Sequence, residues 1–449
     1  LVVAMLAAMI VVPAYAAVAD LNTVYAASKT MSFEGATADG VVNQTCPYCE
    51  AAVDWYPLTQ DNFRTEMPKT DTGRHYYVAE DITTTTWTMV AGVACVHLNG
   101  HNLTDASERV FYVEGTLTIM GDGTVSGGTK NNAEVGSAID AVGVFNLCGG
   151  VYKATGNAPA VTARGVGRNC TINDGAAIIG DSNIEGENRH NLYIENAIIN
   201  MNGGMIAGGD VGTSGNGGNV YITGSGTGYG YLKLYGGVIT GGRAAKGGNI
   251  YIDKVIGALI YLGGGKISGG YAQQGGNIYS ASTRSNSVIG GTPGTTIEYG
   301  YATGDGTSDI GGGNLYVAGN ATSQSLSYVK LIGGATKVNG GNVYVDSTAQ
   351  MRITTSSSIL NGAAAGAGGN VYIADGATLQ LYAATVQGGA CGTRGGNILI
   401  GTGATLQVEY QAKVYGDTAV AGDANIVIKH NGEVLMGNNN GLDLNYEGG

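Results

Sequence analysis

A short segment that recurs along the chain constrains the fold more than any other sequence feature. It reads Gly-Gly-Asn-Φ-Tyr-Φ, where Φ is apolar, with variants such as GGNVYI, GGNLYV and GGNILI. Its asparagines are separated by 28, 30, 28, 37, 28, 28, 27 and 28 residues, and they are Asn191, Asn219, Asn249, Asn277, Asn314, Asn342, Asn370, Asn397 and Asn425. A 28-residue repeat cannot bury its own apolar face, so it must stack on its neighbours. The chain is therefore predicted to be a solenoid.

The alternation of residue types predicts strands in each repeat. Apolar residues follow each Asn at +1 and +3, and the stretches ATLQLY at 377–382 and YLKLY at 231–235 also alternate with period two. Gly-Gly pairs and β-branched residues disfavour helices. We predict an all-β fold, a parallel β-helix (β-solenoid) with three short strands per 28-residue coil: Asn-Φ-Tyr-Φ, a Φ-x-Φ strand, and one like GGVITGG at 236–242. Equivalent strands of successive coils would pair at ~4.8 Å.

The N-terminal third differs from the repeats and suggests the domain organisation. The apolar opening ends in small residues, as a signal peptide does. All four Phe and both Trp lie before residue 150, which favours a bulky cap on the exposed end of the solenoid. We expect a signal peptide at 1–19, an N-terminal cap or small module at 20–75, a parallel β-helix at 76–440 and a truncated tail at 441–449. The expected location is secreted or at the cell surface.

The net charge bears on the class of partner. It is −12, which argues against nucleic-acid binding because phosphate contacts require clustered Lys and Arg. After removal of the signal peptide, no segment is apolar enough to be expected to span a membrane.

The repeated asparagines have a structural explanation. They fall at the same corner of consecutive coils, where each side chain could bond to the next in an amide ladder and tolerate the backbone of a turn. The predicted ladder consists of Asn191, Asn219, Asn249, Asn277, Asn314, Asn342, Asn370 and Asn397.

The repeated tyrosines are the candidate ligand-binding residues. With the +1 and +3 residues inside, Tyr at +2 should point outward and form an aromatic stripe. Such a stripe either supports the sheet by ring stacking or is a docking face for sugar rings or a protein surface. The candidates are Tyr221, Tyr251, Tyr279, Tyr316, Tyr344 and Tyr372, preceded by Tyr193 in the same position.

Cysteine and histidine gather near the N-terminus. Cys46-Pro-Tyr-Cys49 can supply half of a tetrahedral zinc site, with the other half drawn from His75, Cys95 or His97. We take Cys46, Cys49, His75 and Cys95 as candidate ligands of a structural zinc, the one cofactor that the sequence suggests. A disulfide, natural in an exported protein, and free thiols remain alternatives.

Several of these segments resemble a known family. HYYVAEDI at 75–82, CVHLNGHNLT at 95–104, GTLTIMGDGTVSGG at 115–128 and the GGVITGG and GGNVYI repeats resemble secreted right-handed parallel β-helix repeat proteins of the pectin-lyase-like superfold, especially surface proteins of anaerobic gut bacteria. The resemblance implies a right-handed helix that serves as a stalk or adhesive surface. The same superfold also hosts pectate lyases and polygalacturonases.

The acidic residues do not form an obvious catalytic set. Glu195, Asp253 and Asp346 share position +4 but belong to the first, third and sixth coils, too far apart to cooperate. Asp305 and Asp309 lie in an insertion between Asn277 and Asn314; they could bind calcium or catalyse, but we favour a solvated Gly-Asp turn. We assign no catalytic residue and predict a non-enzymatic extracellular or cell-surface β-helix with an adhesive or structural role, whose candidate partners are glycans or proteins of a host or neighbouring cell. The alternative is a polysaccharide lyase or glycoside hydrolase.

Overall fold

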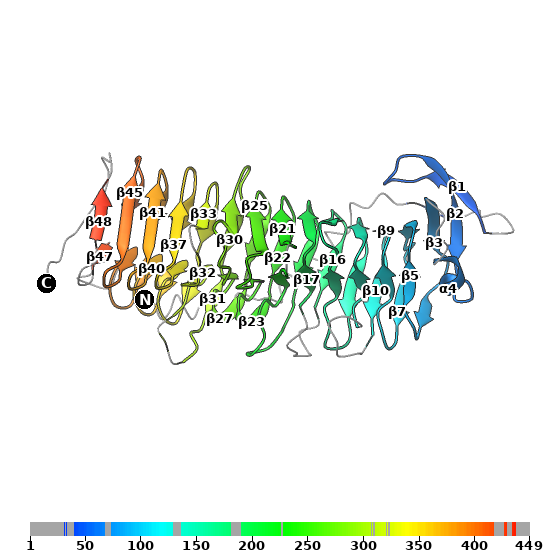
Figure 1. The fold of residues 1–449 in the computed structure, drawn as a ribbon, viewed down its shortest axis with the longest axis horizontal. Helices are drawn as coiled ribbons and strands as arrows, with labels where there is room; N and C mark the ends of the chain where they lie inside the picture. The colour runs from blue at the N-terminus through cyan, green and yellow to red at the C-terminus, as the bar shows by residue number, and fades with distance from the viewer. Residues whose placement is uncertain are drawn as a thin grey trace.

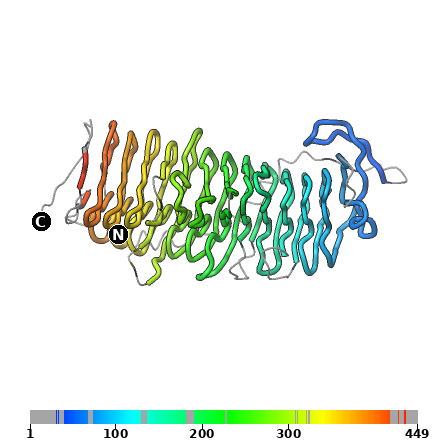
Figure 2. The backbone as a smooth tube through the Cα atoms, in the orientation of Figure 1, coloured from blue at the N-terminus to red at the C-terminus, as the bar shows by residue number. Residues whose placement is uncertain are grey.

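The chain winds into a long rod of stacked coils, with its N-terminal coils at the blue end and its C-terminal coils at the red end (Figures 1 and 2). The structure is a computed structural model, and it describes residues 31, 33, 40–67, 73–128, 136–180, 190–225, 228–306, 308, 310–319, 321, 324–416, 426–428 and 433–436. The expected signal peptide at 1–19, the expected tail at 441–449, Asp309 and Asn425 lie outside these residues.

Sheet A is the longest of the sheets that run along the rod. It contains 16 strands, all paired in parallel except the first two, β1 and β2, which are antiparallel. In spatial order its strands are β1 (Val42–Thr45), β2 (Ala52–Leu58), β3 (Arg74–Val78), β6 (Val93–His97), β9 (Thr116–Met120), β12 (Val144–Leu147), β15 (Asn169–Ile172), β18 (Ile198–Met201), β21 (Gly230–Leu234), β25 (Ala258–Leu262), β29 (Val288–Gly290), β33 (Gln324–Leu326), β37 (Gln350–Ile353), β41 (Thr378–Tyr382), β45 (Thr405–Glu409) and β48 (Glu433–Met436).

Sheet B follows sheet A in each coil and contains 13 parallel strands. At ~4.8 Å per coil they extend over roughly 60 Å. They are β4 (Ile82–Thr84), β7 (Asn102–Asp105), β10 (Thr124–Gly127), β13 (Val151–Ala154), β16 (Ala177–Ile179), β19 (Met205–Ala207), β22 (Val238–Thr240), β26 (Lys266–Ser268), β30 (Thr296–Glu298), β34 (Lys330–Ile332), β38 (Ser358–Leu360), β42 (Thr385–Gln387) and β46 (Lys413–Tyr415).

Sheet C contains the Asn-Φ-Tyr-Φ strands and closes each coil. Its 13 strands are β5 (Thr88–Val90), β8 (Phe111–Val113), β11 (Ile139–Ala141), β14 (Val161–Ala163), β17 (Leu192–Glu195), β20 (Val220–Thr223), β24 (Ile250–Ile252), β28 (Ile278–Ser280), β32 (Leu315–Val317), β36 (Val343–Val345), β40 (Val371–Ile373), β44 (Ile398–Ile400) and β47 (Ile426–Ile428). The predicted all-β parallel solenoid with three strands per coil is thus confirmed.

Six coils add a short fourth strand, which the sequence analysis missed. These strands form sheet D between sheets B and C, and three of them contain only Ala, Thr or Cys. They are β23 (Arg243–Lys246), β27 (Tyr271–Gln274), β31 (Tyr301–Ala302), β35 (Ala335–Thr336), β39 (Ala363–Ala364) and β43 (Ala390–Cys391).

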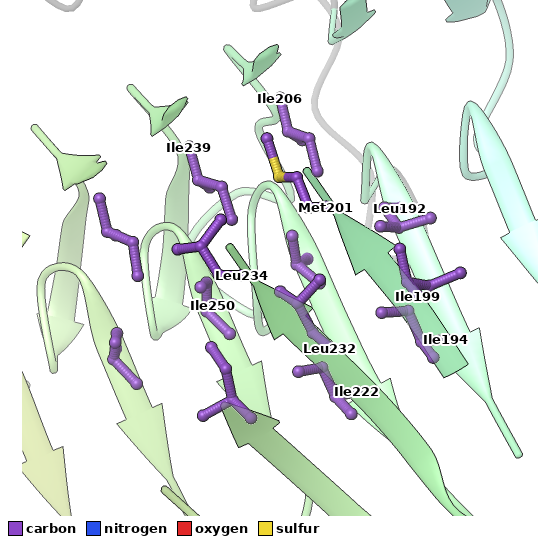
Figure 3. Close-up of a cluster of buried hydrophobic side chains, with 14 of the residues drawn as sticks. Leu192, Ile194, Ile199, Met201, Ile206, Ile222, Leu232, Leu234, Ile239 and Ile250 are labelled. Carbon is purple, nitrogen blue, oxygen red and sulfur yellow. The ribbon is translucent and has the colours of Figure 1, made fainter. Parts of the chain in front are cut away.

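The core lies inside the coil and takes one apolar row from each strand. Figure 3 shows Ile194 of β17, Ile199 of β18 and Ile206 of β19 pointing into the same interior, and the next coil repeats the set. Each of these three side chains is fully buried, which contributes roughly 1.5–3 kcal/mol apiece. Because the register pairs Leu192 with Val220 in β20, like side chains stack on like along the rod.

The N-terminal end is closed by a hairpin and one helical turn. β2 already pairs in parallel with β3, so parallel stacking begins within the 20–75 segment, for which an N-terminal cap or small module was expected. Helix α4 (Phe63–Glu66) buries Phe63, whose ring packs against that of Phe111 at 5.7 Å between centroids. No helix among the residues described above is long and apolar enough to cross a membrane.

The asparagines of the repeat form a continuous amide ladder in the interior of the corner before sheet C. From Asn191 to Asn370, each Nδ2 donates to Oδ1 of the Asn in the next coil at 2.5–2.7 Å, and Asn397 accepts the last of these bonds. In Asn277, Nδ2 also donates to Glu298 O at 2.8 Å, and Oδ1 also accepts the Gly270 N–H at 2.9 Å. The amide is therefore fully satisfied although the residue is completely buried.

The two glycines before each Asn have different structural requirements. Gly275 has φ of 62°, a left-handed conformation that favours Gly. At Gly276, an added Cβ would lie 2.3 Å from Tyr301 N and 2.4 Å from Gly313 O, so the backbone of the next coil leaves no room for a side chain. The pair thus permits both the turn and the close stacking of coils.

Replacing one ladder residue should destabilise the rod strongly. Asn277→Ala removes a bond from each of the two neighbouring amides and from two backbone groups, at ~1 kcal/mol or more each, so we expect a loss of about 3 kcal/mol or more. Gln407→Ala, on the partly exposed outer face of β45, is the control and should change stability by less than about 0.5 kcal/mol. Equal urea unfolding midpoints for the two variants would contradict a stabilising ladder.

Mild acid should weaken the coils around His190. This residue is buried, its Nδ1 donates to Gly217 O at 2.9 Å, and burial lowers its pKa to about 4. In the unfolded chain the pKa of this histidine is ~6.5, so the stability that depends on neutral His190 is fully present above that pH. This stability is lost as the pH falls towards 4, and the loss amounts to at most about 3 kcal/mol. Hydrogen-exchange protection factors in β17, corrected for the intrinsic pH dependence of exchange, should fall over this range, and less so in His190→Asn.

Candidate functional site

The cysteines and histidine proposed as metal ligands converge on the outer face of sheet A. His75 of β3 and Cys95 of β6 are direct cross-strand partners, and the next residues along each strand, Tyr76 and Val96, point into the core. Alternation along the strands therefore places His75 and Cys95 side by side on the outside. Cys46 and Cys49 come from the turn between β1 and β2, whose hairpin lies against this face at the blue end of the rod (Figure 1).

These side chains approach one another as two close pairs, and Cys49 lies outside the compact group that Cys46, His75 and Cys95 form. Cys46 Sγ lies 4.0 Å from Cys95 Sγ, and Cys49 Sγ lies 3.4 Å from His75 Nε2. The ligand atoms of Cys46, His75 and Cys95 are all within 4.8 Å of one another, and in the described part of the chain no other three His, Cys, Asp or Glu residues form such a group. None of the six cysteines forms a disulfide bond in this structure.

Hydrogen bonds and apolar contacts hold this cluster. The Cys49 N–H donates to Cys46 Sγ at 3.5 Å, and the turn is closed by the Glu50 N–H, which donates to Cys46 O at 2.8 Å. The bond with Cys95 lowers the pKa of the Cys46 thiol, while the same bond and burial raise the pKa of Cys95. The apolar surroundings are Phe33, Trp55, Tyr77, Met120 and the partly buried Cys148.

His97, the remaining candidate in this region, takes a different place. It is paired in register with Tyr77, one row away from His75 and Cys95. Its ring makes an edge contact with Phe33, at 5.1 Å between centroids, and burial lowers its pKa to about 4. His97 is therefore part of the apolar packing of the hairpin.

The tyrosines of the repeat do not form the exposed face that was expected. They point away from the core, but five of the six candidates are buried: Tyr251, Tyr279, Tyr316, Tyr344 and Tyr372 are 2–8% exposed, and Tyr221 is partly buried. The cover comes from residues that follow each strand, such as Ala318 and Ala374, and from segments before it, such as Ile310 and Ala367. These five tyrosines form a second packing layer outside sheet C, which leaves little ring surface for a ligand.

Ring stacking and a carboxylate stabilise this layer. The rings of Tyr279, Tyr316 and Tyr344 are nearly parallel, with interplanar angles of 8° and centroids 4.5 and 5.3 Å apart. The Tyr316 hydroxyl donates to Asp346 Oδ2 at 2.7 Å, and burial raises the pKa of that hydroxyl. Asp346, one of the acids considered for catalysis, is thus engaged in packing.

Two of the other acids are also held by neighbours. Asp253 accepts the Thr223 hydroxyl at 2.9 Å, and Asp305 accepts the Ser308 N–H at 2.8 Å within its turn. A pocket of about 370 Å³ lies beside Tyr372, and Lys337, Asn339 and Arg394 supply its polar lining. No Asp or Glu lines this pocket, so it does not contain the paired carboxyl groups used by most glycosidases.

A different set of tyrosines is exposed, and sequence reasoning missed it. These residues, which we call the corner tyrosines, lie on or next to the corner between sheets A and B. Tyr235, Tyr328 and Tyr410 are 45%, 38% and 62% exposed, and two further residues are partly buried. The full set is Tyr235, Tyr261, Tyr328, Tyr382 and Tyr410. The available signal was Tyr at or just after the end of the Φ-x-Φ strand, as in YLKLYGG and TLQLYAA.

Comparison with known proteins adds no assignment: no protein-family model, no curated protein and no solved structure matches this chain.

The buried position of the repeat tyrosines predicts how they respond to substitution. Tyr316→Ser should reduce stability by about 3 kcal/mol or more because it removes a stacked, buried ring. Tyr316→Phe keeps the ring and should cost only about 1 kcal/mol for the lost hydroxyl bond. Tyr410→Asn, at an exposed left-handed position, is the matched control and should have little effect. Urea unfolding of the three variants measures these differences, and a Tyr316→Ser protein as stable as the control would disprove the packing role.

Proposed function

We propose that this protein is a non-enzymatic β-helix that works outside the cell, with an adhesive role in which it binds extended polysaccharide chains along its rod. The observation that carries the proposal is the row of corner tyrosines on a rigid, regularly spaced scaffold. The apolar opening of the chain supports export, and the resemblance to pectin-lyase-like surface proteins supports an adhesive role.

The corner tyrosines are arranged along the rod axis. They are distributed over seven consecutive strands of sheet A, from β21 to β45, which at ~4.8 Å per strand corresponds to roughly 30 Å. Tyr235 and Tyr261 have ring centroids 5.7 Å apart, and Tyr382 and Tyr410 have centroids 4.7 Å apart. A polymer lying along this corner would meet an aromatic ring in most coils.

The chemistry of the corner suits a sugar polymer. Tyr offers a large, rigid, amphipathic surface at low entropic cost, with a hydroxyl that can bond to sugar hydroxyls. Polar side chains accompany the rings: the Gln380 amide donates to Glu409 at 2.9 Å, and Arg352 lies 5.2 Å above the Tyr382 ring. Because the net charge of −12 repels anionic polymers, we propose neutral polysaccharides as the ligand class.

Removing the corner rings should weaken binding without unfolding the rod. We consider one variant in which four corner tyrosines are replaced by Asn: Tyr235, Tyr328, Tyr382 and Tyr410. Its affinity for immobilised neutral polysaccharides such as xyloglucan or galactomannan should fall at least about tenfold. Asn is chosen because Tyr328 and Tyr410 have φ of 59° and 51°, which Asn tolerates. Far-UV circular dichroism should be unchanged.

A matched control distinguishes the corner from general stickiness. Tyr299 is 51% exposed, also has φ of 51°, and follows β30 at a different corner of the rod. Tyr299→Asn should bind as the unmodified protein does, and an equal loss in this variant, or preferential binding to polygalacturonate, would refute the proposed surface. Incubation with the same polysaccharides should release no unsaturated or reducing-end products; sustained turnover would instead support the enzyme alternative.

A further inference from the structure

We infer that Cys46, Cys49, His75 and Cys95 bind a structural Zn²⁺ ion that fastens the β1–β2 hairpin to the outer face of sheet A. The inference is independent of the proposed binding surface, because the corner tyrosines lie on coils far along the chain from this site.

Two of the separations between the side chains match those of tetrahedral zinc. With Zn–S of ~2.3 Å and Zn–N of ~2.0–2.1 Å, tetrahedral ligands lie ~3.8 Å apart for two sulfurs and ~3.5 Å apart for sulfur and nitrogen. The sulfurs of Cys46 and Cys95 are 4.0 Å apart, and the Cys49 sulfur and His75 Nε2 are 3.4 Å apart. Cys46, His75 and Cys95 form the compact group, and the Cys49 thiol beside His75 would complete a closed set of three thiols and one imidazole.

The orientation of the thiols favours a metal over a disulfide within the Cys-Pro-Tyr-Cys turn. A disulfide requires sulfurs ~2.05 Å apart. Cys46 Sγ contacts Cys95 Sγ and the Cys49 N–H, and Cys49 Sγ contacts His75. The two sulfurs of the turn therefore face partners on sheet A, and the Cys49 N–H bond to Cys46 Sγ is the kind of outer-sphere contact that supports a thiolate ligand.

The location of the site explains what the ion would stabilise. Cys46 and Cys49 belong to the hairpin, whereas His75 and Cys95 belong to two successive coils of the rod. Strand β1 is the outermost strand of sheet A at this end. A shared ion would join the hairpin to both coils, in addition to the apolar contacts of Phe33 and Trp55 with His97 and His75. Binding would release thiol protons and add to the folding free energy of this end.

Metal analysis of the purified full chain tests the inference directly. We expect about one zinc per chain by inductively coupled plasma mass spectrometry, and Co²⁺ substitution should give the intense visible absorption of tetrahedral thiolate coordination. Cys95→Ser and His75→Ala should each lower the zinc content by at least about tenfold. Cys170→Ser and Cys391→Ser, which remove buried thiols elsewhere on the rod, should retain zinc fully.

Hydrogen exchange separates loss of metal from loss of fold. Chelation should accelerate exchange in β1 and β2 while leaving the central coils, for example β20 to β28, protected. Cys49→Ser, which alters an exposed residue and so spares the core, should reproduce the chelator effect. Absence of stoichiometric zinc, a Cys46–Cys49 disulfide found by mass spectrometry of non-reduced protein, or iron in place of zinc would each overturn the inference.

Discussion

The structure depends on the in-register stacking of one coil on the next. Parallel strands bond to their equivalents along the rod, and at the corner before sheet C the asparagine ladder continues the same pattern through side chains. The ladder requires a fixed distance between coils, and that distance requires glycines where Cβ atoms would strike the neighbouring backbone, as at Gly276. Asparagine, glycine and the aliphatic core residues are thus three consequences of one geometric condition.

Much of the fold could be predicted because the same strand pattern recurs in each successive repeat. Strand type follows from period-two alternation, and stacking follows from a repeat too short to fold alone. The fourth strand was not predictable in this way. Strands β35, β39 and β43 are two residues long, and Ala-Thr, Ala-Ala and Ala-Cys carry no alternation. They form because the preceding strands place them beside their equivalents one coil away.

The candidate sites show the same division between local pattern and spatial arrangement. The period-two alternation correctly predicted that the repeat tyrosines point away from the core. It contained no information on the residues that cover them, which include Ile310, Ala318, Ala367 and Ala374. The corner tyrosines were overlooked because they vary in position from coil to coil. Residue type and spacing were enough to propose Cys46, Cys49, His75 and Cys95 as a ligand set. The cross-strand register that places His75 beside Cys95 became known only from the structure.

The distance along the sequence between bonded amides of the ladder has a consequence for how the protein folds. These partners are 27 to 37 residues apart throughout, so each coil can form its ladder bonds with a segment about one repeat away in the sequence. A chain of this kind can order by adding coils to any nucleus that has already formed, at a loop-closure cost that is nearly the same at every step. The hairpin is an exception, because Cys46 and Cys95 lie 49 residues apart and meet only after two coils exist. The hairpin itself can close locally, but its docking onto the rod is therefore a late event that marks completion of the first coils.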